Sequence, residues 1–159
     1  MAAKKLMLDY VYEHEMARSS QVFLSQPLGG DQVKDYTWAQ TMDQARRMAT
    51  HLKSRGLEPG ARVGILSKNC AHFFIAELAI WMAGGTTVAI FPTETADTIR
   101  YVLEHSDCKL VLASPTPAPS SLARGFSRLD PATATYYEEA TLALADVVDD
   151  PEQAALLAG

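Results

Sequence analysis

The clearest pattern along the chain is a stripe of apolar residues with helical spacing between positions 38 and 52. Thr37 and Gln40 stand before and within its first turn in the arrangement of a capping box, in which two side chains satisfy backbone N–H groups. Gly56 follows the stripe, and glycine commonly ends a helix in the left-handed conformation. The pattern therefore predicts a helix between Thr37 and Gly56. Its stripe consists of Trp38, Met42, Ala45, Ala49 and Leu52.

Short apolar runs alternate with helical segments over the next part of the chain. The runs lack a clean two-residue alternation, which is typical of strands buried on both faces of a sheet. Strands joined by helices form parallel pairs through right-handed crossovers. The sequence therefore predicts an α/β fold of three layers, with a mainly parallel sheet flanked by helices. The expected strands are 62–66, 86–91 and 109–113, and the expected helices are 70–83, capped by Asn69 and ended by Gly84, and 95–105.

Weaker patterns precede these elements. Charged and apolar residues alternate at roughly helical spacing over 4–16, which predicts a short helix. The segments 21–26 and 34–36 have the composition of short strands. Turn-forming residues at 27–31 lie between them, so the two segments are expected to form a hairpin.

The composition changes after Ser114. Five of the eight prolines and ten alanines fall within 114–159, together with two basic and seven acidic residues. We therefore expect two parts: 1–113 as the N-terminal α/β part, and 114–159 as a Pro/Ala-rich acidic segment. Within the second part, 115–121 is expected to be a loop or linker and 134–147 a helix, which Asp149-Asp150-Pro151 would end.

Charge and cysteine content narrow the function classes. The 159 residues carry 14 Lys and Arg against 19 Asp and Glu, and this acidic balance argues against a general nucleic-acid or anionic-membrane binder. Cys70 and Cys108 are too few for a disulfide framework or a four-cysteine zinc site, which fits a reducing compartment. The apolar stretch 73–82 is far shorter than the roughly 20 residues of a transmembrane helix. We expect a cytoplasmic protein with no transmembrane segment.

The candidate ligand-binding residues lie together in one short segment. Ser67-Lys68-Asn69 follows the first predicted parallel strand and precedes a helix, where α/β sheets bind ligands and where helix N-termini favour anions. The simpler interpretation is that Asn69 caps the helix and Lys68 faces water. No glycine-rich phosphate loop of the Walker or dinucleotide type occurs, and the four histidines fit no metal pattern. We assign no catalytic residue and no metal ligand.

Several segments in order resemble the N-terminal region of AMP-forming acyl-CoA synthetases, in the adenylate-forming ligase superfamily. Residues 26–30 and 67–72 favour its long-chain fatty acyl branch. The segments that carry the resemblance are Tyr36-Thr37-Trp38-Ala39-Gln40, residues 56–66, Asn69, residues 79–88, Phe91-Pro92-Thr93 and residues 99–112.

The resemblance implies an N-terminal portion of the adenylate-forming ligase fold. Members of the family use ATP, magnesium and coenzyme A to join a carboxylate, such as a fatty acid, first to AMP and then to the coenzyme A thiol. Their Thr-Ser-Gly-Thr-Thr-Gly-x-Pro-Lys phosphate loop and later catalytic motifs do not occur in this sequence. Residues 149–159 resemble the approach to that loop. The chain alone is therefore expected to be an inactive scaffold that binds none of these cofactors.

Two hypotheses follow from these patterns. In the first, the chain is the N-terminal piece of an acyl-CoA synthetase. In the second, it is a non-catalytic α/β module that binds a partner, such as the rest of a synthetase, through an incomplete sheet. An incomplete sheet leaves an open edge and uncovered apolar faces, so self-association of the isolated chain is also expected.

Overall fold

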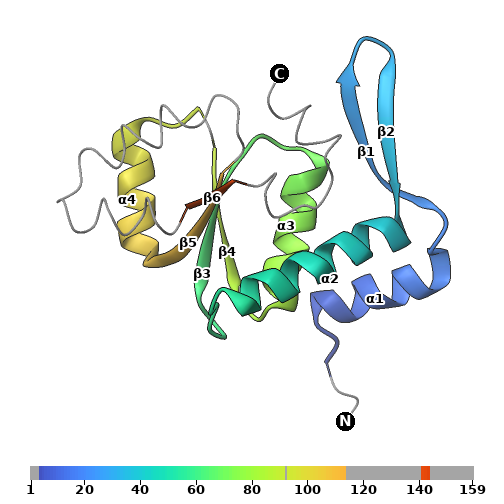
Figure 1. Ribbon diagram of the computed structural model, residues 1–159, viewed down its shortest axis with the longest axis horizontal. Coiled ribbons are helices and arrows are strands. Elements are labelled where there is room, and N and C mark those ends of the chain that lie inside the picture. Colours follow the sequence, from blue (N-terminus) through green and yellow to red (C-terminus); the bar gives the residue numbers. More distant parts are fainter. Residues whose placement is uncertain (1–3, 92, 114–140, 144–159) are drawn as a thin grey trace.

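The computed structural model describes residues 4–91, 93–113 and 141–143. Its centre is a parallel sheet of four strands in the order β4-β3-β5-β6 (Figure 1). A separate antiparallel hairpin, β1-β2, stands beside the helices. The α/β fold with a parallel sheet and flanking helices is thus confirmed. The strands are β1 (Val22–Gly29), β2 (Gln32–Thr37), β3 (Arg62–Leu66), β4 (Thr86–Ile90), β5 (Cys108–Ala113) and β6 (Thr141–Ala143).

Helices cover both faces of the sheet. Helix α4 lies on one face, and α3 lies on the other with α2 packed over it and α1 beside α2 (Figure 1). The helices are α1 (Met7–Arg18), α2 (Trp38–Ser54), α3 (Ala71–Met82) and α4 (Ala96–Ser106).

The core forms on both sides of the sheet because side chains alternate along its strands. On β3, Val63 and Ile65 join the cluster that contains α2 and α3. Leu66 joins the second cluster, with Ile99 and Leu103 of α4. All five side chains are buried, so the central strand is covered on both faces, as the continuous apolar run predicted.

Helix α2 has the ends that the sequence predicted. Gln40 N donates to Thr37 Oγ1 at 3.2 Å, and Thr37 N donates to Gln40 Oε1 at 2.9 Å, which completes the capping box. Gly56 follows the helix with a φ of +84°, a conformation that costs glycine little. Four residues of the apolar stripe, Met42, Ala45, Ala49 and Leu52, are buried in the cluster that contains α3, and the Trp38 ring stacks on Phe23 of β1. The helix was therefore predicted correctly from its start to its end.

Several element boundaries differ from the sequence-based expectation, and two of these differences have a clear physical reason. Helix α1 begins at Met7 instead of Lys4, because Asp9 Oδ2 accepts a hydrogen bond from Leu6 N at 2.7 Å and marks the first turn there. Strand β1 continues through Pro27 to Gly29, where a turn was expected. Proline is tolerated in that strand because the sheet has only two strands, each with an edge that needs no N–H donor.

A further difference concerns the C-terminal part. A helix over 134–147 was wrong for residues 141–143, which form β6 parallel to β5. The edge of β5 offers backbone hydrogen bonds that a nearby extended segment can satisfy, and this pairing overrides local helix preference. The rest of that expected helix and the expected loop at 115–121 lie outside the described residues.

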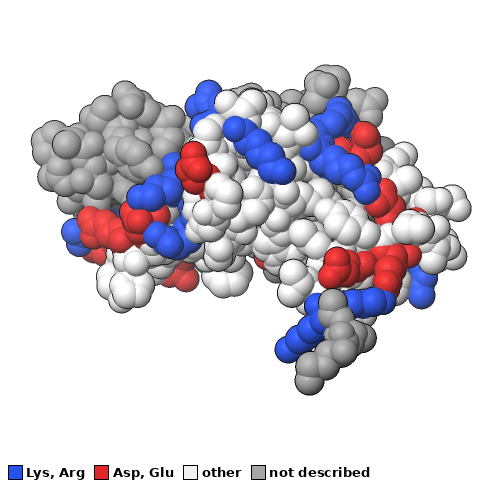
Figure 2. All heavy atoms as spheres, turned by 90° about the horizontal axis from the view of Figure 1, so that it is seen from below, with Lys and Arg blue, Asp and Glu red and all other residues white. Residues whose placement is uncertain are grey.

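The surface carries mixed charges. On the face seen in Figure 2, described Lys and Arg side chains occur close to Asp and Glu side chains, in groups around uncharged areas. The described residues form several ion pairs, such as that of Arg47 with Asp43 on α2 at 3.1 Å. Among the helices that the structure describes, none has the length and apolar character needed to cross a membrane.

Candidate functional site

The predicted site is the corner between β3 and α3, which we call the β3–α3 corner (residues 67–70). It lies at the carboxyl end of the parallel strand β3, the edge where open α/β sheets bind ligands. Ser67 is only 2% exposed, whereas Lys68 and Asn69 are exposed. The Ser67 hydroxyl donates to the Lys68 carbonyl at 3.0 Å and lies 3.7 Å from Cys70 Sγ. Ser67 therefore holds the corner together, and the two other candidates face solvent.

Asn69 does not cap α3, so that expectation was wrong. The N-cap residue is Cys70, and its side chain makes no capping bond. The acceptor comes instead from the hairpin: Gln26 Oε1 accepts a hydrogen bond from Ala71 N at 2.9 Å. The other end of the same amide is also held, because Gln26 Nε2 donates to the Pro27 carbonyl at 2.8 Å. The helix start is thus satisfied by a residue distant in sequence.

A small cavity of about 140 Å³ lies between the hairpin and the corner, and we call it the hairpin cavity. Its polar groups are the amides of Gln26 and Asn69, the Ser25 hydroxyl and the Cys70 thiol, with no acidic or basic side chain among them. This set can donate and accept hydrogen bonds, but it offers no general acid or base of the usual kind. The lining is Leu24, Ser25, Gln26, Pro27, Asn69, Cys70, Ala71 and Phe74.

Two buried aromatic side chains lie behind the corner. His72 of α3 is 4% exposed and Tyr36 of β2 is 3% exposed, and their rings meet edge to face with centroids 6.4 Å apart. Sequence reasoning missed this pair and also missed Gln26. The long separation of these residues along the chain left no local signal for their contact.

Burial changes the acid–base properties of two groups. Cys108 is 1% exposed, and burial raises the pKa of its thiol, which keeps it protonated and unreactive. Burial also raises the pKa of the Glu77 carboxyl on α3. Neither group lies at the β3–α3 corner. Within the part of the chain that the structure describes, no three His, Cys, Asp or Glu side chains cluster in a way that could hold a metal ion.

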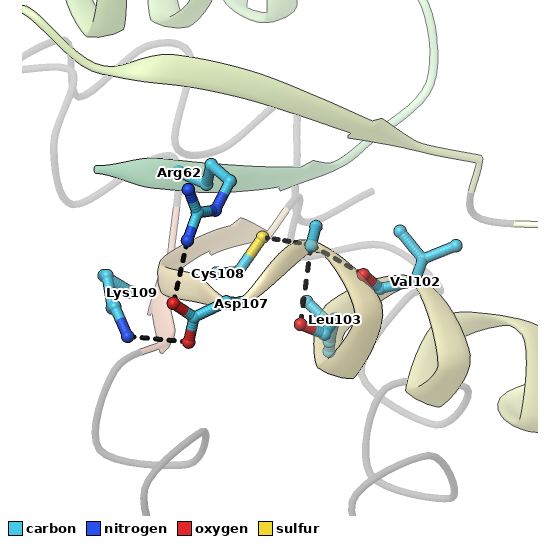
Figure 3. A network of polar contacts seen from close by, with 7 residues as sticks. Arg62, Val102, Leu103, Asp107, Cys108 and Lys109 are labelled. Atoms are coloured by element: carbon cyan, nitrogen blue, oxygen red, sulfur yellow. Dashed lines mark hydrogen bonds and ion pairs between the residues drawn. The ribbon is translucent and has the colours of Figure 1, made fainter. Parts of the chain in front are cut away.

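A network of polar contacts connects the amino ends of β3 and β5, at the opposite end of the sheet from the β3–α3 corner (Figure 3). Arg62 of β3 donates to Asp107 Oδ2 at 2.8 Å, and Lys109 donates to Asp107 Oδ1 at 2.6 Å. Lys109 and Arg62 both lower the pKa of the Asp107 carboxyl. Asp107 follows α4 with a φ of +51°, so this network fixes a left-handed turn between α4 and β5. Its role is structural.

A cavity of about 560 Å³ opens at this same end of the sheet, beside the segment that joins α2 to β3. Its lining is largely apolar and includes the charged side chains of Arg55, Glu58 and Lys109. It lies at the amino ends of β3 and β5, at the opposite end of these strands from the β3–α3 corner.

Comparison with protein families shows to which family the chain belongs. The model of the AMP-binding enzyme family matches residues 13–156. The chain belongs to this family. It corresponds to the N-terminal region of adenylate-forming ligases, as the resemblance implied. The phosphate loop and catalytic motifs of the family have no counterpart in its 159 residues.

Individual relatives fall into two functional groups. The chain is 33% identical over 103 residues to the long-chain-fatty-acid–CoA ligase FadD15 of Mycobacterium bovis, which covers 65% of the chain and 17% of FadD15. It is 37% identical over 76 residues to a component of the mycosubtilin synthase of Bacillus subtilis, covering 48% of the chain and 3% of that protein. The family membership is therefore clear, while the relatives differ in the compounds their names refer to.

A solved structure shows the same fold. The N-terminal subdomain of NpsA from Klebsiella oxytoca matches with a TM-score of 0.72 at 17% identity, over 92% of this chain and 33% of that subdomain. The chain also spans less than a fifth of the length of the curated relatives that it matches. It thus represents a minor part of the proteins to which it is related.

Proposed function

We propose that this chain is the N-terminal scaffold of an AMP-forming fatty acid–CoA ligase of the long-chain type. In this reaction a carboxylate oxygen attacks the α-phosphorus of ATP, which releases pyrophosphate and forms an acyl-adenylate. The thiol of coenzyme A then attacks the acyl carbonyl and releases AMP. ATP, magnesium and coenzyme A would bind to parts of the ligase outside this chain, because the residues that hold them in the family have no counterpart here.

The observation that carries the proposal is the family match over residues 13–156 combined with the similarity to FadD15. The sequence of residues 26–30 and 67–72 adds support for the long-chain branch. In this proposal 1–113 forms the α/β part of the AMP-binding domain. The segment 114–159 leads toward the phosphate loop, and the protein works in the cytoplasm, where its free cysteines stay reduced.

The β3–α3 corner would contribute to this function mainly through position. Lys68 and Asn69 are exposed at the carboxyl edge of the sheet, so they remain candidates for contact with an anionic ligand group. Ser67 is a weaker candidate for ligand contact, because its hydroxyl is already bonded inside the corner.

A chimera tests the proposal. The whole chain replaces the matching segment of FadD15, and we call this protein the FadD15 chimera. We expect it to catalyse fatty-acid-dependent exchange of pyrophosphate into ATP and to form acyl-CoA, while the isolated 159-residue chain gives no exchange above a buffer control. FadD15 without the segment is the second control. Exchange by the isolated chain would refute the scaffold role, and a chimera that folds but activates only amino acids would refute the fatty acid assignment.

The second hypothesis, a non-catalytic module that binds a partner, has one observation in its favour. Within the described residues, β4 pairs with β3 on one side only, so its other backbone edge is open. A chain of this kind would bind another polypeptide without any exchange activity in the FadD15 chimera. The same chimera therefore separates the two hypotheses.

A further inference from the structure

Helix α3 has an unusual outward side. The outward sides of α2 and α4 carry charged residues, such as Arg47 on α2 and Glu104 on α4, as expected for helices that face water. At the N-cap and along α3, four of the side chains that reach the surface lie at steps of three and four residues along one stripe, and the partly exposed Phe73 and Met82 lie beside it. We call it the outer stripe of α3; it consists of Cys70, Phe74, Glu77 and Trp81.

This stripe is largely apolar. Phe74 is 44% exposed, and its ring lies edge to face with that of Phe73 at 5.7 Å between centroids. Trp81 is partly exposed two turns further along the same side. An aromatic pair at this spacing on a helix is typical of a surface that packs against another element.

A cavity lies at each end of the outer stripe. Phe74 lines the hairpin cavity beside β1. Trp81 lines a second cavity of about 540 Å³ together with residues 6–9 and Tyr12. Leu6 and Met7 are 71% and 65% exposed beside it. The apolar surface therefore extends from the hairpin, along α3, to the start of α1.

Glu77 is the only charged side chain in the outer stripe. It is half-buried among apolar neighbours, and within the described residues no hydrogen bond or ion pair is formed by its carboxylate. A carboxylate that loses water without gaining a donor raises the free energy of the fold. A surface that covers the stripe must therefore supply a donor at this point.

We propose that the outer stripe of α3 is the docking face for a further segment of the ligase polypeptide, which packs apolar side chains on Phe74 and Trp81 and places a Lys or Arg opposite Glu77. The inference rests on the proposed function. The N-terminal subdomain of NpsA shares this fold, and the chain matches 33% of that subdomain. Two thirds of such a subdomain thus remain to cover surfaces that are exposed here.

A second copy of this chain fits the stripe less well. In a two-fold contact the same patch meets itself, so an interface centred on the stripe brings two Glu77 carboxylates into one apolar contact. Like charges repel strongly in such a poorly hydrated contact. A Lys or Arg side chain placed opposite Glu77 instead forms an ion pair with its carboxylate.

The test compares one substitution in two proteins. In the isolated full chain, Glu77→Lys is expected to change the Tm by no more than about 2 °C, because the half-buried carboxylate has no ion-pair partner among the described residues to lose and the longer Lys side chain reaches water. In the FadD15 chimera the same substitution places two cations together, and we expect the Tm to fall by at least about 5 °C. Glu104→Lys is the matched control, since it makes the same change at an exposed position of α4. Equal shifts for the two variants in the chimera overturn the proposal.

A second measurement does not depend on folding of the chimera. The dye 8-anilinonaphthalene-1-sulfonate is expected to bind the isolated chain at the outer stripe, so Phe74→Lys should lower its fluorescence at least about twofold. Tyr101→Lys, at a 62% exposed aromatic residue of α4, should leave it nearly unchanged. Equal fluorescence in both variants overturns the proposal. The Tm can be measured whether or not the FadD15 chimera is active. An inactive chimera whose Tm falls with Glu77→Lys would therefore refute the proposed function and still support the docking face.

Discussion

The side chain of Gln26 and the backbone of Ala71 are joined by a 2.9 Å hydrogen bond across 45 positions of the sequence. The bond fixes the hairpin to the first turn of α3, because its acceptor lies on β1 and its donor is a backbone N–H that the helix itself cannot satisfy. One amide oxygen thus stabilises both the helix end and the placement of the hairpin.

Replacing Gln26 tests this coupling. Gln26→Leu removes the acceptor, and we expect the full chain to lose about 1 kcal/mol of unfolding free energy, as for other lost helix caps. Gln26→Glu is the control, since a carboxylate also accepts the bond and favours a helix N-terminus. Urea unfolding measures the stability, and hydrogen exchange at the Ala71 amide measures the bond directly. Unchanged exchange at Ala71 in Gln26→Leu would show that the hydrogen bond does not form in solution.

This coupling also marks the limit of what the sequence could predict. The ends of α2 were predicted correctly because Thr37, Gln40 and Gly56 act within a single turn of the helix they delimit. The start of α3 was misplaced by one residue, because its acceptor lies on another element and Asn69 was the nearest cap in the sequence. Residues next to a helix determine where it begins and ends and can be read from the sequence. A hydrogen bond between distant elements forms only in the assembled fold, so the sequence does not reveal it.

The same contrast applies to the sheet. The order of strands and helices along 62–113 predicted parallel pairing, since a helical crossover brings the chain back to the end of the sheet at which the preceding strand began. It did not predict β6, whose three residues, Thr141–Ala143, carry too short a pattern to distinguish a strand from a helix. Sequence reasoning placed residues 67–69 between a parallel strand and a helix, where the structure has them, and their binding of a ligand stays a prediction. It missed Gln26 because no local pattern links that residue to the corner.

The carboxyl of Asp107 should make stability depend on pH. Lys109 and Arg62 lower its pKa in the folded chain below the ordinary value of 3.8. The unfolded state therefore binds a proton first as the pH falls, so the contribution of Asp107 to stability is complete well above pH 3.8 and is lost below it.

Asp107→Asn isolates this charge, because asparagine also accepts the left-handed conformation at this position. We expect wild type to be more stable than the variant at pH 7, with the difference disappearing as the pH falls through the folded pKa of Asp107. Urea unfolding of both proteins at pH 7 and near pH 3 measures the two differences. A difference that stays constant over this range would show that the ion pairs do not stabilise the turn.

The inward side of α3 is expected to be far more sensitive than its outward side. Ile75 is fully buried between the sheet and α2, and Ile75→Ala leaves a cavity that should cost about 2 to 5 kcal/mol. Tyr101→Ala removes a larger side chain from an exposed position of α4 and should change stability by no more than about 0.5 kcal/mol. Chemical denaturation compares the two variants. Similar losses in both would mean that α3 is not packed as a core helix.

The open edge of β4 predicts self-association of the isolated chain. Within the described residues its outer backbone groups pair with no other strand, and such edges join readily to a second copy. We expect sedimentation at micromolar concentration to reveal species larger than the monomer. Ala89 is exposed on this strand, so Ala89→Lys should shift the distribution toward monomer by adding a charge that opposes pairing. The matched control is Glu104→Lys on α4, which adds the same charge away from the edge. A sharp monomer for the unmodified chain would refute association, and equal shifts in both variants would move its origin away from β4.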